Sequence, residues 1–74
     1  MSIVAINARN QFKGVIKRIK RGDVVCEVEI NTAADIFTSV VTTSSVDELG
    51  LKPGNEVIAL FKATDVALAS FSKI

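Results

Sequence analysis

The chain has 74 residues, of which 49% are hydrophobic, and its nine Lys and Arg residues nearly balance its eight Asp and Glu residues. A net charge of +1 supplies no overall field that would attract nucleic acid or an anionic membrane. The single cysteine excludes an intrachain disulfide, and the lack of histidine removes the commonest metal ligand. We expect one domain over residues 1–74, and so high an apolar content in so short a chain favours an oligomer.

The first half of the chain predicts two antiparallel strands. Residues 12–20 alternate in polarity and form the first long strand, in which Gly14 predicts a bulge or a tight bend. After a turn, residues 24–30 return with the clearest alternation in the chain. Glu27 and Glu29 face the basic first strand, so cross-strand ion pairs are expected to neutralise part of its charge.

The second half predicts two more strands and a short helix. Residues 36–42 and 56–62 are apolar on both faces, which calls for another subunit to cover the second face. Between these strands, residues 43–50 predict a compact helix, with N-capping by Ser44 or Ser45 and a glycine at its end.

The ends of the chain predict further extended structure. Residues 3–6 are a short apolar lead-in that pairs with another strand, and residues 66–71 form the fifth strand of the sheet. The order of elements predicts an all-β fold, a five-stranded OB-like Greek-key barrel with one short helix between strands 3 and 4. Four aromatic residues are expected in its interior: Phe12, Phe37, Phe61 and Phe71.

The residues needed for catalysis are missing from the sequence. Cys26 lies in mid-strand without an activating partner nearby, and the four glycines are too scattered for a phosphate-binding loop. We therefore expect a binding protein without an organic cofactor, not an enzyme. An OB-like order also fits a small single-stranded nucleic-acid-binding module, but the expected burial of the phenylalanines argues against base stacking. A purely structural oligomerisation domain is a third alternative.

Two short segments carry the densest set of hydrogen-bond donors. They are Asn7-Ala8-Arg9-Asn10-Gln11 and Lys62-Ala63-Thr64. Each places a cation beside an alanine, whose small side chain lets backbone N–H groups reach a ligand. Such a donor-rich set suits a small, doubly charged oxyanion, which offers only acceptors, better than an organic substrate.

These segments, with the run of residues 46–54, resemble the molbindins, the small molybdate-binding Mop proteins related to transport-associated OB (TOBE) domains. The resemblance covers most of the chain, and its specificity lies in the combination of segments. It implies a homohexamer, built as a trimer of dimers, that stores or buffers molybdate or tungstate in pockets between subunits. The chain start lacks the order of a signal peptide, so a cytoplasmic location is expected, with no membrane or nucleic-acid partner.

The resemblance also implies which residues bind the anion. Carried onto this sequence, the commoner pocket takes Asn7, Ala8 and Arg9 from one subunit and Lys62 and Ala63 from another. Arg9 and Lys62 supply charge, and the two alanines expose backbone N–H donors. The family's usual serine before Ala-Arg is Asn7 here, whose amide is bulkier but still donates. A second kind of anion site, on three-fold axes, is implied at Lys20, Gly22, Thr43 and Ser44.

Overall fold

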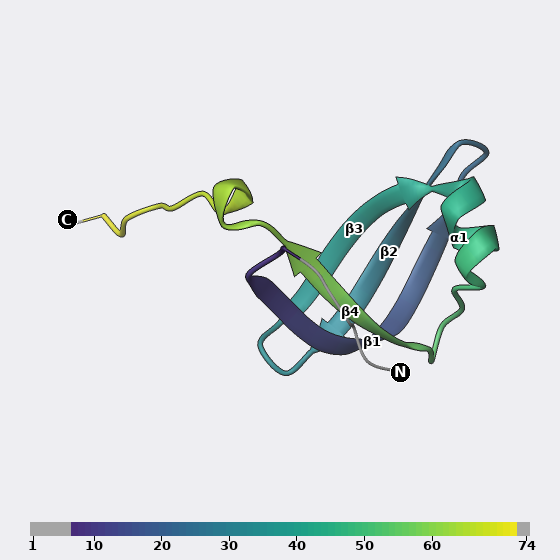
Figure 1. The fold of residues 1–74 in the computed structure, drawn as a ribbon, viewed down its shortest axis with the longest axis horizontal. Coiled ribbons are helices and arrows are strands. Elements are labelled where there is room, and N and C mark those ends of the chain that lie inside the picture. The colour runs from purple at the N-terminus through teal and green to yellow at the C-terminus, as the bar shows by residue number, and fades with distance from the viewer. Residues whose placement is uncertain (1–6, 73–74) are drawn as a thin grey trace.

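The computed structural model describes residues 7–72, so the lead-in strand expected at residues 3–6 lies outside the described part of the chain. Its elements are β1 (Asn10–Arg21), β2 (Val25–Thr32), β3 (Ile36–Thr42), α1 (Thr43–Leu49), β4 (Glu56–Phe61) and the 3₁₀ turn η1 (Ala63–Asp65). The strands form one antiparallel sheet, ordered β3-β2-β1-β4, which curls with α1 at one end (Figure 1). The predicted all-β class, with a short helix between the third and fourth strands, is confirmed.

The prediction of a fifth strand at residues 66–71 is wrong for this chain. Beyond η1 the chain runs away from the sheet in extended form, as Figure 1 shows. Leu68 is 93% exposed and Phe71 is 98% exposed, so the expected burial of Phe71 is also wrong. Over residues 7–72 the sheet is therefore a curled half-barrel of four strands, open on the side that a fifth strand would close.

A bulge in β1 changes which residues face the interior. Ile16 lies opposite Ile30 and Arg18 lies opposite Glu29, which leaves Lys17 as the extra residue. The insertion inverts the alternation, so Arg18 turns to the outer face and does not share the face of Ile16. The bulge expected at the glycine of this strand thus lies three residues further along.

Gly14 lies where β1 and β2 approach each other closely. A Cβ atom at this position would lie 2.6 Å from Cγ2 of Ile30 and 2.7 Å from the carbonyl oxygen of Asn31. Only glycine fits such contacts, and its presence lets β1 bend tightly against β2. The sheet can therefore curl around its own concave face.

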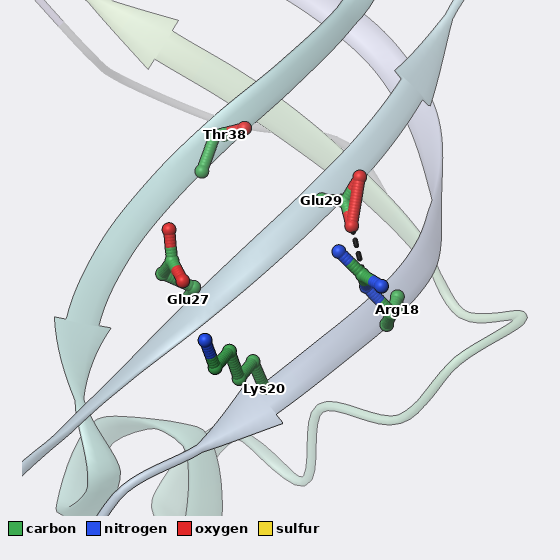
Figure 2. Close-up of a pocket in the computed structure, with 5 residues that line it drawn as sticks. All are labelled: Arg18, Lys20, Glu27, Glu29 and Thr38. Atoms are coloured by element: carbon green, nitrogen blue, oxygen red, sulfur yellow. Dashed lines mark ion pairs between the residues drawn. The ribbon is translucent and has the colours of Figure 1, made fainter.

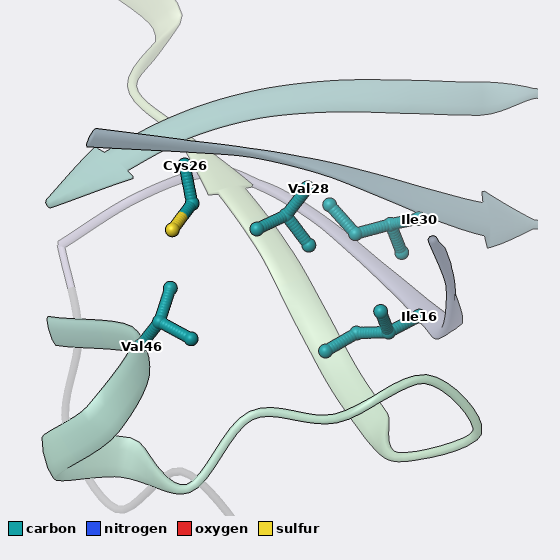
Figure 3. Close-up of a cluster of buried hydrophobic side chains, with 5 residues drawn as sticks. All are labelled: Ile16, Cys26, Val28, Ile30 and Val46. Carbon is teal, nitrogen blue, oxygen red and sulfur yellow. The ribbon is translucent and has the colours of Figure 1, made fainter. Parts of the chain in front are cut away.

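The core lies between the concave face and α1. Its buried side chains are Ile16, Cys26, Val28, Ile30 and Val46 (Figure 3). Val46 projects from α1 toward the strands and covers one end of the half-barrel (Figure 3). The helix has seven residues, and no helix within residues 7–72 is long and apolar enough to cross a membrane.

The N-cap of helix α1 lies two or three residues earlier than the capping pattern predicted. Thr42 is the N-cap, and its Oγ1 accepts a hydrogen bond of 3.1 Å from the N–H of Ser45. The predicted caps at Ser44 and Ser45 are wrong, because both residues already lie inside the helix. The expected glycine stop is confirmed, since Gly50 has a φ of 62° and ends α1 in the left-handed conformation.

A bidentate ion pair holds α1 against the end of β1. The guanidinium of Arg21 donates to both carboxylate oxygens of Asp47, at 3.0 and 2.9 Å. The hydrogen bond from Arg21 lowers the pKa of the Asp47 carboxyl below its ordinary value. Because both side chains are exposed, solvent screens the pair and it orients the helix more than it stabilises the fold.

Candidate functional site

Strands β1 and β4 bring the two donor-rich segments to one end of the sheet. The strands pair antiparallel, and the last step of their ladder places Asn10 opposite Phe61. Arg9 directly precedes Asn10 and Lys62 directly follows Phe61. The two cations therefore occupy neighbouring positions just beyond the ladder, where the start of β1 meets the arrowhead of β4 (Figure 1).

Gln11 fixes the shape of the first segment. Its Nε2 donates a hydrogen bond of 2.8 Å to the carbonyl oxygen of Ala8. Ala8 is buried, whereas Asn7 and Arg9 on either side are exposed. The alanine anchors the segment to the molecule, and the polar side chains beside it remain accessible to a ligand.

Asp65 closes the second segment into a tight turn. Its backbone N–H donates to the carbonyl oxygen of Lys62 at 2.9 Å, and its Oδ2 accepts from the N–H of Lys62 at 3.2 Å. The Lys62 amide is therefore used within the turn. Ala63 is the first residue of η1, so its own N–H has no acceptor inside that helical turn.

Arg9 and Lys62 differ from the arginines elsewhere on the sheet in having no counterion. Over residues 7–72, neither of their side chains makes a hydrogen bond or an ion pair. Arg18 and Arg21 each pair with a carboxylate, at nitrogen–oxygen distances of 2.6 and 2.9 Å. Two exposed cations thus occupy neighbouring positions without an ion-pair partner, and their donors remain available to an oxyanion.

The residues of the second predicted anion site divide between two places. Thr43 Oγ1 donates its one hydrogen to the carbonyl of Gly22 at 2.7 Å, and the Thr43 N–H donates to another carbonyl of the loop after β1 at 2.8 Å. Ser44 is exposed beside it at the start of α1, whereas Lys20 lies on the outer face opposite Glu27. Gly22, Thr43 and Ser44 are brought together, Lys20 points elsewhere, and this site remains a prediction.

A shallow polar pocket of about 160 Å³ lies on the outer face of the sheet. Its lining residues are Arg18, Lys20, Glu27, Glu29 and Thr38 (Figure 2). The ion pair expected between the strands is confirmed for Arg18 and Glu29, whose atoms Nε and Oε2 are 2.6 Å apart. With two cations matched by two carboxylates, this pocket has no net positive charge to offer an oxyanion.

The concave face opens into an apolar hollow of about 830 Å³, bounded on two sides by β3 and β4. Three half-buried phenylalanines meet there, with ring centroids 5.2 Å apart for Phe12 and Phe37 and 5.9 Å apart for Phe12 and Phe61. The rings pack against one another, which occupies surfaces that a stacking nucleobase would need.

Sequence reasoning passed over Gln11 and Asp65 as individual residues. Gln11 lies three residues after Ala8, and Asp65 lies three residues after Lys62. At this spacing a polar side chain can reach back to the main chain and form a hydrogen bond with it. That spacing was the available signal, and only the folded geometry shows which polar side chains use it.

Comparison with known proteins places these features in a family. Residues 6–68 match the sequence profile of the TOBE domain. The chain is 41% identical to molybdenum-pterin-binding protein 3 of Clostridium pasteurianum over 66 residues, which are 88% of this chain and 97% of that protein.

Two solved structures have a similar fold. One is a molybdate-binding protein from Sporomusa ovata, with a TM-score of 0.86 and 30% identity over 90% of this chain and 100% of that one. The other is the cytoplasmic molybdate-binding protein ModG with molybdate bound, with a TM-score of 0.76 and 42% identity over 80% of this chain and 43% of that one. The fold is therefore OB-like, and the chain belongs to the TOBE-domain family as a member of the molybdenum-pterin-binding (Mop) proteins.

Proposed function

We propose that this protein binds molybdate, with tungstate as the alternative ion, and stores or buffers it. One observation carries the proposal: β1 and β4 place Arg9 and Lys62, neither of which has an ion-pair partner within residues 7–72, at neighbouring positions of one sheet end. Similarity to proteins named as molybdate-binding supports the choice of anion.

The chemistry of the site fits a fully ionised oxyanion. Molybdate is a dianion at neutral pH and offers only acceptors, so a pocket of donors satisfies every oxygen. Phosphate keeps at least one proton at neutral pH, and that P–OH group would require an acceptor that such a pocket lacks. Sulfate has the same charge as molybdate and is smaller, so size must separate the two.

The binding residues that we propose are those of the two segments. Arg9 and Lys62 provide charge-assisted hydrogen bonds, and Ala8 and Ala63 provide backbone N–H donors. The amide of Asn7 adds a donor where the family has serine. Such a pocket holds its ligand without a covalent step, so we propose a binding role and no catalysis.

We further propose that residues 1–74 act as one domain within a cytoplasmic homo-oligomer. The family resemblance implies a hexamer with anion pockets between its subunits. Exposed apolar side chains support this assembly. Val40 is 64% exposed, Leu49 is 72% exposed and Leu68 is 93% exposed, and a monomer would leave all of them in water. The second anion site at Lys20, Gly22, Thr43 and Ser44 would then lie where subunits meet.

The fifth strand of the barrel would come from a second copy. The segment of residues 66–72 is extended, carries exposed apolar side chains and leaves its own sheet (Figure 1). The open concave face of the half-barrel is apolar and lacks a closing strand. Insertion of this segment from a partner copy would cover both surfaces at once.

Isothermal titration tests the proposed function. We expect the protein to release heat and saturate with molybdate, to bind sulfate much more weakly and to leave phosphate unbound. A single-stranded oligonucleotide added to the same protein examines the alternative of a nucleic-acid module. Binding of the oligonucleotide with no heat from molybdate would replace our proposal by that alternative.

A further inference from the structure

Each proposed anion-binding segment is braced by one polar side chain. Gln11 Nε2 donates to the carbonyl oxygen of Ala8 at 2.8 Å, and Asp65 Oδ2 accepts from the N–H of Lys62 at 3.2 Å. The Asp65 N–H also donates to the Lys62 carbonyl oxygen at 2.9 Å, so the turn is closed at both ends. Both braces are formed by residues of a single chain.

We propose that Gln11 and Asp65 are positioning residues, which hold the two segments in their binding shape before the oxyanion arrives. The inference rests on the proposed function, because it concerns the same site. A segment that is already ordered loses less conformational entropy on binding than a free one, so pre-ordering raises affinity. Neither residue needs to touch the anion for this effect.

The two braces differ in their electrostatic effect on an anion. A backbone carbonyl oxygen is an acceptor and disfavours a dianion nearby. The side-chain amide of Gln11 donates a hydrogen bond to the Ala8 carbonyl oxygen and so reduces its repulsion of an anion. The brace at Lys62 has the opposite character, since it uses a carboxylate. Asp65 thus orders the turn while its negative charge opposes the ligand, and the two effects can be separated by mutation.

Three variants separate the positioning role from simple electrostatics. Asp65→Asn keeps an oxygen that accepts from the Lys62 N–H and removes the charge, so we expect molybdate binding equal to or tighter than that of the wild type. Asp65→Ala removes the charge and the brace together, and we expect affinity to fall about three- to tenfold. Gln11→Ala should weaken binding to a similar extent, because the Ala8 carbonyl loses its partner.

Asn55 offers a matched control outside the site. Its Oδ1 accepts from the N–H of Lys52 at 2.8 Å, which is the same kind of brace in the turn before β4. We expect Asn55→Ala to lower thermal stability while molybdate affinity stays unchanged. A loss of affinity in Asp65→Ala without a loss in Asn55→Ala therefore assigns the effect to position and not to general stability.

The experiment is isothermal titration with molybdate for these variants, together with amide hydrogen exchange at Lys62 in the ligand-free proteins. We expect exchange at Lys62 to be slow in the wild type and in Asp65→Asn and faster in Asp65→Ala. If Asp65→Ala binds as tightly as Asp65→Asn, the carboxylate acts by charge alone and the inference is overturned while the proposed function stands. If the wild type itself takes up no molybdate, the proposed function fails and the inference fails with it.

Discussion

At the scale of single residues, the site depends on two cations of different chemistry. The guanidinium of Arg9 is a rigid planar fork that presents several donors in fixed directions. The ammonium of Lys62 is a compact charge on a flexible stem and can adjust to the anion. Arg9 should therefore contribute geometry as well as charge, whereas Lys62 should contribute mainly charge.

This difference predicts unequal tolerance of conservative changes. We expect Arg9→Lys to weaken molybdate binding although the charge is kept, because the fork is lost. Lys62→Arg should retain more affinity than Lys62→Ala, for which loss of a charge-assisted hydrogen bond costs about 1.5–3 kcal/mol. Titration of the three variants measures the effect, and equal binding by Arg9→Lys and the wild type would refute the role of the fork.

The sequence identified the donor-rich segments of Arg9 and Lys62, but only the family resemblance joined the two cations in one pocket. Taken alone, each is an ordinary surface cation, and their proximity depends on the register in which Asn10 meets Phe61. Register follows from the global packing of the sheet and not from local preference, so composition and spacing could not place them. The braces from Gln11 and Asp65 are local contacts, and they were missed because several nearby polar side chains could have made them.

At the scale of elements, local patterns predicted most strands and misplaced their irregularities. Alternation located β2 within two residues, because one face of that strand is buried. The apolar run of residues 36–42 located β3. Alternation failed at Lys17, where the bulge changes which residues of β1 face the core. The capping pattern failed at α1, where Thr42 caps the helix in place of a serine. Thr42, Ser44 and Ser45 each carry a hydroxyl that could cap a helix. Because β3 ends at Thr42 and the helix starts at the next residue, Thr42 becomes the cap.

The cap predicts a selective effect on stability. We expect Thr42→Ala to lower the free energy of unfolding by about 0.5–2 kcal/mol, because the Ser45 N–H loses its acceptor. Ser44→Ala is the matched control, since its hydroxyl accepts no backbone hydrogen bond of the helix start, and it should cost far less. Urea denaturation of both variants gives the comparison, and a larger loss in Ser44→Ala would show that the helix starts elsewhere.

The ion pair between Arg21 and Asp47 predicts a dependence on pH. Because Arg21 lowers the pKa of Asp47 in the folded state, the stabilisation is present above the ordinary aspartate pKa of about 3.9 and is lost as the pH falls through the lower folded value. We expect Asp47→Asn to lower the melting temperature by a few degrees at most at pH 7, and the difference should shrink at lower pH and in high salt. A difference that grows on acidification would contradict the pairing.

At the scale of the whole molecule, the structure is a half-barrel with an uncovered apolar face. Strands β3 and β4, apolar on both sides, indicated a need for a partner, and exposed Val40 and Leu60 agree with that expectation. The fifth strand was mispredicted because residues 66–71 have strand-like composition, and the sequence does not tell whether the strand they join belongs to the same chain. A segment of this kind can complete a sheet in another copy equally well.

The proposed exchange of this segment predicts which substitution disrupts assembly. We expect Leu68→Asp to shift the protein to smaller species, because a charge would enter the apolar face of a partner. Ala69→Asp adds the same charge to the same segment on the opposite face of an extended strand and should disturb assembly far less. Native mass spectrometry distinguishes the species, and an unchanged oligomer in Leu68→Asp would place residues 66–72 outside the interface.

The measurement that bears most directly on the account is molybdate titration of the Arg9→Ala, Lys62→Ala and Lys17→Ala variants, each confirmed in the same assembly as the wild type. Lys17 is an exposed cation on the same strand as the proposed site but at the bulge, so it controls for general charge. We expect the first two variants to lose about ten- to a hundredfold in affinity and Lys17→Ala to bind as the wild type does. Wild-type affinity in both Arg9→Ala and Lys62→Ala would show that the anion binds elsewhere and would contradict the account.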